Sequence, residues 1–72
     1  MPARLRDLIR AGRQWGIVVE PPGSGSHWIA RKGELAFPLP CHNGGKSEID
    51  DIYIRRMCRA FGVDEKELRK LM

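Results

Sequence analysis

The sequence has no long apolar segment and few cysteines. Its longest uninterrupted apolar runs are only a few residues long, whereas a membrane-spanning helix needs about 20. No apolar segment follows the arginines near the N-terminus, so no secretory signal peptide is readable, and we expect a cytoplasmic protein with no membrane partner. Cys41 and Cys58 are not closely spaced, which is typical of reduced thiols rather than a disulfide framework, although one bridge stays open.

The 72 residues correspond to a single domain, residues 1–72, with a small core. There are 13 Lys and Arg residues against 9 Asp and Glu, a formal net charge of +4. This excess favours a polyanionic partner, most commonly nucleic acid. Many small domains are mildly basic for reasons of solubility alone, so the charge by itself leaves both interpretations open.

The first predicted element is a helix over residues 2–12, with apolar residues at helical spacing. Arg6, Arg10 and Arg13 lie at i, i+4 and i+7 and therefore form one stripe on its outer surface. The stripe is either a solvated helix face or a surface that follows phosphates.

Three runs with strand character follow the helix, over residues 17–19, 27–31 and 35–39. Turn residues separate them, including Lys32-Gly33 between the second and the third. Because the strands are sequential and closely connected, we expect an antiparallel meander. Pro38 in the third run indicates an edge position or a strand end.

Two helices complete the predicted chain. The buried stripe of the first consists of Ile54, Met57, Cys58 and Phe61. Gly62 suits a left-handed cap, and Asp64 suits the N-cap of a short final helix. The prediction is an α+β fold of order α-β-β-β-α plus a short C-terminal helix, with both main helices on one face of a three-stranded antiparallel sheet.

Common catalytic and metal-binding motifs are not supported by the spacing. His27, Cys41, His42 and Cys58 are metal-ligand types but lack the close pairs of structural zinc sites. Residues 44–47 read GGKS but lack the leading glycine of a phosphate-binding P-loop. Serines and histidine adjacent along a strand face opposite ways, which disfavours a serine triad. We expect no metal and no cofactor.

After these motifs are set aside, the remaining indication of chemistry is a histidine in a chain rich in cationic side chains. An imidazole takes or gives protons near neutral pH. RNA cleavage without metal needs a base for the 2′-hydroxyl, an acid for the leaving oxygen, and cations or amides for the phosphorane charge. His27 follows the loop GSGS at residues 23–26, so the alternatives are a catalytic imidazole and an ordinary histidine at a strand end.

The ordered motifs resemble the HicA toxin family of HicAB toxin-antitoxin modules. They are Gly25-Ser26-His27-Trp28-Ile29, Pro38-x-Pro40-x-His42, Gly44-Gly45-Lys46, Phe61-Gly62-Val63 and the junction Trp15-Gly16. The resemblance covers nearly the whole chain. It implies a double-stranded-RNA-binding-domain-like fold and a metal-independent ribonuclease that cleaves mRNA, arrests growth and is neutralised by a HicB antitoxin.

The resemblance also implies residue roles. His27 falls on the family's catalytic histidine, Gly25 and Ser26 on the residues that shape its loop, and His42 on the histidine of the loop after the third strand. Residues 47–51 read SEIDD, where many relatives have a short Pro/Gly/Thr start to the helix. This acidic start leaves the path of the substrate open.

The sequence therefore predicts an endoribonuclease toxin with His27 as general acid or base. Candidate phosphate-holding cations, chosen by charge and placement, are Arg6, Arg10, Arg13, Lys32 and Lys46. The alternative is a noncatalytic RNA-binding module of the same fold. A third hypothesis is an interaction protein anchored by Trp28 or Trp15.

Overall fold

The computed structural model describes residues 3–23, 27–40 and 48–72. In chain order the elements are β1 (Ala3–Arg4), α1 (Leu5–Arg13), β2 (Val18–Glu20), β3 (His27–Lys32), β4 (Leu35–Pro40), β5 (Glu48–Ile49), α2 (Asp51–Phe61) and α3 (Glu65–Lys70). None of the helices in these ranges is both long enough and apolar enough to cross a membrane.

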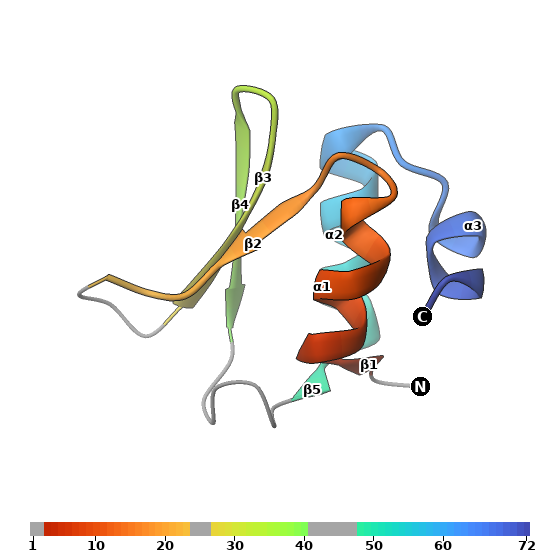
Figure 1. Ribbon diagram of the computed structural model, residues 1–72, viewed down its shortest axis with the longest axis horizontal. Helices are drawn as coiled ribbons and strands as arrows, with labels where there is room; N and C mark the ends of the chain where they lie inside the picture. The colour runs from red at the N-terminus through yellow and green to blue at the C-terminus, as the bar shows by residue number, and fades with distance from the viewer. Residues whose placement is uncertain (1–2, 24–26, 41–47) are drawn as a thin grey trace.

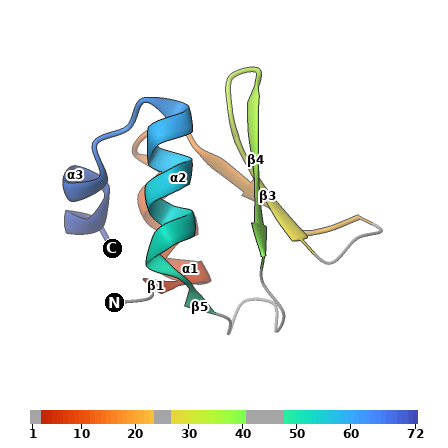
Figure 2. The same ribbon diagram turned by 180° about the vertical axis from the view of Figure 1, so that it is seen from behind.

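The main sheet is three-stranded and antiparallel, in the order β2-β3-β4. In its register Val19 lies opposite Ala30, and Trp28 lies opposite Leu39. Helices α1 and α2 lie side by side on one side of this sheet, and α3 lies beyond them (Figures 1 and 2). The predicted α+β class and three-stranded antiparallel sheet are confirmed.

A second, two-stranded sheet joins segments that are far apart in the sequence. β1 pairs antiparallel with β5, with Ala3 opposite Ile49 and Arg4 opposite Glu48. Arg4 is extended, with φ −75° and ψ 140°, and α1 begins at Leu5. The predicted start of this helix at residue 2 is therefore wrong, because the two residues before Leu5 belong to a strand. Two-residue strands have no periodicity that a sequence pattern could reveal.

The core fills the space between the main sheet and the helices. Its buried residues are Leu5, Leu8, Ala11, Ile17, Ala30, Leu39, Ile49, Ile54, Met57, Cys58, Phe61, Val63 and Leu68. This set contains all four residues of the predicted apolar stripe on α2, including Cys58. The predicted buried face of α2 is confirmed.

The ends of α2 and α3 follow the local signals in the sequence. Gly62 has a φ of 70°, the left-handed conformation, and the N–H of Val63 donates to the carbonyl of Cys58 at 2.9 Å. The carboxylate of Asp64 accepts from the backbone N–H groups of Lys66 and Glu67 at 2.9 and 3.4 Å. Both predicted caps are confirmed, and they set the turn that carries α3 back along the helices.

Candidate functional site

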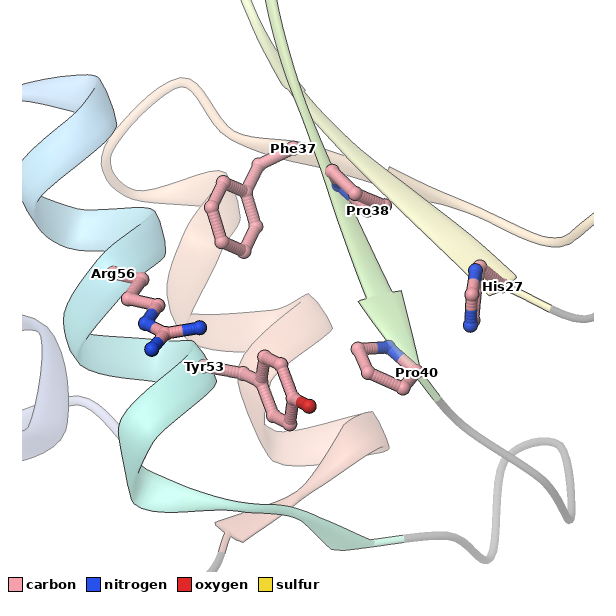
Figure 3. Close-up of a pocket in the computed structure, with 6 residues that line it drawn as sticks. All are labelled: His27, Phe37, Pro38, Pro40, Tyr53 and Arg56. Atoms are coloured by element: carbon pink, nitrogen blue, oxygen red, sulfur yellow. The ribbon is translucent and has the colours of Figure 1, made fainter.

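A pocket of about 380 Å³ lies where the end of β4 approaches α2. The side chains that line it come from β3, β4 and α2 and are His27, Phe37, Pro38, Pro40, Tyr53 and Arg56 (Figure 3). Since β4 is an edge strand of the main sheet, the pocket reaches around that edge from one side of the sheet to the other.

His27 is the first residue of β3 and is exposed. Successive side chains of a strand point to opposite faces, and Trp28 accordingly packs against the core, opposite the fully buried Leu39. The core therefore holds β3 through Trp28 and leaves the His27 imidazole at the rim of the pocket. The imidazole is therefore accessible to a molecule bound in the pocket.

Two prolines shape the sheet edge at the pocket. Pro40 lies opposite His27 and Pro38 opposite Ile29 in the pairing of β3 with β4. A proline has no N–H to donate to a ladder, so it is tolerated where its nitrogen faces away from the neighbouring strand. The outer edge of β4, which faces away from β3, therefore lacks two backbone donors, and the two pyrrolidine rings line the pocket.

The helical side of the pocket is formed by Tyr53 and Arg56 (Figure 3). They are three residues apart on α2, which places them on adjacent turns of one helix face. Tyr53 is half-buried and Arg56 is exposed. Neither residue was predicted as part of the site; the available signal was their i, i+3 spacing beside the apolar stripe of α2.

The cations predicted to hold phosphates do not gather at this pocket. Arg6, Arg10 and Arg13 are exposed on α1, and none of them lines the pocket. The Arg10 guanidinium donates to the carbonyl of Met72 at 2.9 Å. Lys32 is at the opposite end of the six-residue strand β3 from His27, about 16 Å away at ~3.3 Å per residue. A role for these four residues in RNA binding stays a prediction, outside the pocket that His27 lines.

Four further predicted site residues, Gly25, Ser26, His42 and Lys46, lie outside the described residues. All four were predicted to bind substrate, with Gly25 and Ser26 shaping the loop before His27, Lys46 holding a phosphate and His42 the nearest candidate for a second catalytic group. These roles stay predictions.

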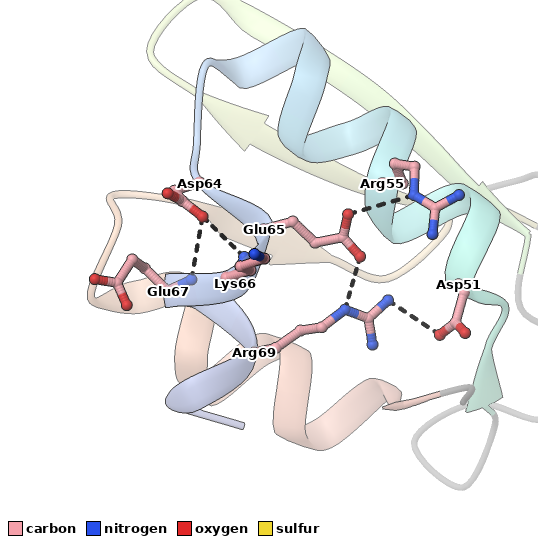
Figure 4. Close-up of polar contacts among 7 residues, drawn as sticks. All are labelled: Asp51, Arg55, Asp64, Glu65, Lys66, Glu67 and Arg69. Atoms are coloured by element: carbon pink, nitrogen blue, oxygen red, sulfur yellow. Dashed lines mark hydrogen bonds and ion pairs between the residues drawn. The ribbon is translucent and has the colours of Figure 1, made fainter.

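Asp51, the first residue of α2, is held by an ion pair from α3 (Figure 4). A guanidinium nitrogen of Arg69 lies 3.0 Å from Asp51, and another lies 2.8 Å from Glu65. Glu65 also pairs with Arg55 at 3.4 Å. Burial alone would lower the pKa of Arg69, but the hydrogen bonds to Glu65 and Asp51 outweigh it and the pKa is raised. The negative charge of Asp51 is thus compensated within the protein.

Cys58 is a packing residue and not a nucleophile. It is 2% exposed, and burial, with a smaller contribution from Glu65, raises the pKa of its thiol to about 11. The thiolate is the reactive form of cysteine, so the neutral thiol is inert at physiological pH.

Among the described residues, no group of three or more His, Cys, Asp or Glu side chains is arranged to hold a metal ion.

Comparisons with known proteins add no family assignment. Comparison of the chain with protein-family models, with curated proteins and with solved structures finds no match.

Proposed function

We propose that this protein is a HicA-like toxin of a type II toxin-antitoxin module, an endoribonuclease that cleaves mRNA without a metal ion. The observation that carries the proposal is the exposed His27 imidazole at the rim of a pocket that also contains a guanidinium and aromatic rings. The motifs around His27 that resemble the HicA family support the same activity.

In the proposed reaction a base removes the proton of a ribose 2′-hydroxyl, and the resulting oxygen attacks the adjacent phosphorus. The bond from phosphorus to the 5′-oxygen of the next nucleotide breaks, and that oxygen takes up a proton from an acid. The products are a 2′,3′-cyclic phosphate and a free 5′-hydroxyl. His27 performs one of these two proton transfers, and His42 is the predicted candidate for the other.

The arrangement of the fold supports an RNA ligand. We propose a double-stranded-RNA-binding-domain-like fold for this chain, and the presence of both large helices on one side of a three-stranded antiparallel sheet supports this proposal. Such domains bind RNA chiefly through shape, phosphates and 2′-hydroxyls. A HicB-like antitoxin is the proposed protein partner, and it would inhibit by covering the His27 surface.

The proposal is tested by expressing the wild type, His27→Ala and Lys66→Ala in cells and by incubating each purified protein with mRNA in EDTA. Lys66 is exposed on α3 and serves as the surface control. We expect growth arrest and chelator-resistant cleavage from the wild type and from Lys66→Ala, and neither from His27→Ala. A folded His27→Ala protein that still cleaves RNA would overturn the assigned role of His27.

The alternative is a noncatalytic RNA-binding module, and the same experiment separates it from the enzyme. Such a module would leave the RNA intact in every reaction, while its affinity would fall steeply with salt because Lys and Arg side chains displace counterions from phosphates. Intact RNA with salt-sensitive binding by the wild type would replace the enzymatic proposal with this one.

A further inference from the structure

We propose that the pocket beside β4 binds one nucleotide of single-stranded RNA, the neighbour of the phosphate on which His27 acts. Arg56 holds the phosphate of this nucleotide, and the rings of Tyr53 and Phe37 hold its base. The inference rests on the proposed function, because it places the substrate relative to His27.

The size and position of the pocket match a single nucleotide. Its volume of about 380 Å³ lies at the lower end of the ~300–1,000 Å³ typical of small-molecule sites. In Figure 3, His27 lies on one side of the end of β4, and Arg56 and Tyr53 project from α2 on the other side. An RNA strand that crosses the end of β4 would therefore place one phosphate at His27 and the next at Arg56.

The Arg56 guanidinium in this pocket is not paired with a carboxylate of the described residues, so it can bind an anion. Among the residues that the structure describes, Arg55 and Arg69 are bound to carboxylates of the cluster in Figure 4, whereas no carboxylate pairs with Arg56. A guanidinium presents two parallel N–H donors that match a phosphate. The ion-pair cluster also compensates Asp51, so this carboxylate of α2 does not oppose an anion in the pocket.

The aromatic side chains indicate what lies next to the phosphate. Phe37 and Tyr53 are both half-buried and line the pocket from β4 and from α2. Single-stranded nucleic acids are held by stacking of bases on aromatic rings combined with contacts to the backbone. A base paired within a duplex does not present its face in this way, so the pocket favours an unpaired nucleotide.

The prolines of β4 argue against a peptide strand as the occupant. Addition of a strand to a sheet edge depends on hydrogen bonds from the exposed backbone of that edge. Pro38 and Pro40 remove two backbone donors from the outer edge of β4 next to the pocket. The edge is therefore a poor template for a strand, while it leaves the cavity open to a planar base.

The test measures binding of a short, fluorescently labelled, single-stranded RNA in which fluorine replaces every 2′-hydroxyl, so that no cleavage by 2′-oxygen attack is possible. Arg56→Ala is compared with Arg59→Ala, a matched control on the same helix that is exposed and does not line the pocket. We expect Kd to rise roughly tenfold for Arg56→Ala, as for the loss of one charged hydrogen-bonded contact, and to change less than about threefold for Arg59→Ala. Equal weakening by the two variants overturns the inference.

A second pair of variants tests the ring of Tyr53. Tyr53→Phe keeps the aromatic face and Tyr53→Leu removes it, so we expect near wild-type Kd for the first and a rise of roughly tenfold for the second, as for the loss of one stacked base. Equal values for Phe and Leu would exclude a stacking role. Far-UV circular dichroism of each variant ensures that only folded proteins are compared.

Cleavage of ordinary RNA is measured separately with the same proteins. If Arg56→Ala alone weakens RNA binding and the wild type leaves RNA intact, the nucleotide site is retained and the nuclease is rejected. If the wild type cleaves RNA but Arg56→Ala and Arg59→Ala weaken RNA binding equally, the nuclease is retained and the nucleotide site is rejected.

Discussion

Substituting His27 and Trp28 one at a time separates chemistry from packing at the start of β3. Trp28 is partly buried against the core, whereas His27 is exposed on the opposite face. Replacing a fully buried large aromatic residue by Ala costs ~3–5 kcal/mol, so for the partly buried Trp28 we expect a loss of about 2–3 kcal/mol in unfolding free energy. For His27→Ala we expect a change within about 0.5 kcal/mol, as for other surface substitutions.

Urea unfolding followed by far-UV circular dichroism measures both values without relying on the tryptophan signal. A domain of this size is stabilised by only about 4–11 kcal/mol, so the Trp28→Ala loss is a large part of the total and is easily resolved. Trp28→Phe is the matched control and should recover most of the loss. If His27→Ala destabilises the fold as strongly as Trp28→Ala, His27 is a structural residue and its assignment to the site is refuted.

Three further predictions concern the framework of the site. Gly62→Ala should lower the free energy of unfolding by about 1 kcal/mol, because Gly62 has a φ of +70°. Gly23 has neither a positive φ nor a neighbour within 4 Å of an added Cβ, so Gly23→Ala should leave the melting temperature nearly unchanged. Equal shifts in melting temperature for the two variants would contradict this. Arg69→Met should cost about 1–2 kcal/mol through loss of two charged hydrogen bonds, and urea unfolding in low and high salt should show the difference shrinking with salt; a salt-independent difference would point to packing instead. Because the pKa of Cys58 is about 11 when folded against 9.0 for the free thiol, the folded state holds this proton more tightly, and the corresponding stability, at most about 3 kcal/mol, is complete below pH 9 and is lost as the pH rises to 11. Unfolding under reducing conditions should therefore be less pH-dependent in Cys58→Ala than in the wild type, and identical slopes would count against this pKa.

The elements with strong local signals were predictable from the sequence. The apolar stripe of α2 has the helical period, and its end at Gly62 depends on a backbone conformation that glycine adopts at little cost. The opposite orientations of His27 and Trp28 follow directly from the two-residue period of a strand. In these places local sequence and tertiary structure agree.

Predicting the pocket from the sequence would have required long-range information that local sequence patterns do not contain. His27 and Arg56 are separated by 29 positions in the chain, yet both line the same cavity, because the register of β3 with β4 and the packing of α2 bring them together. Charge alone instead favoured the arginines of α1, which do not line the pocket. The pairing of β1 with β5 is likewise a long-range contact between two-residue segments.

The central claim, metal-independent cleavage by His27, is tested most directly by the end groups of the RNA products. The wild type and His27→Ala are incubated in EDTA with an oligoribonucleotide and with a matched oligonucleotide that lacks all 2′-hydroxyls. The account predicts that the wild type converts only the ribonucleotide, to fragments ending in 2′,3′-cyclic phosphate and 5′-hydroxyl, and that His27→Ala converts neither. Cleavage of the 2′-deoxy substrate, or the same cyclic-phosphate products from His27→Ala, would contradict it.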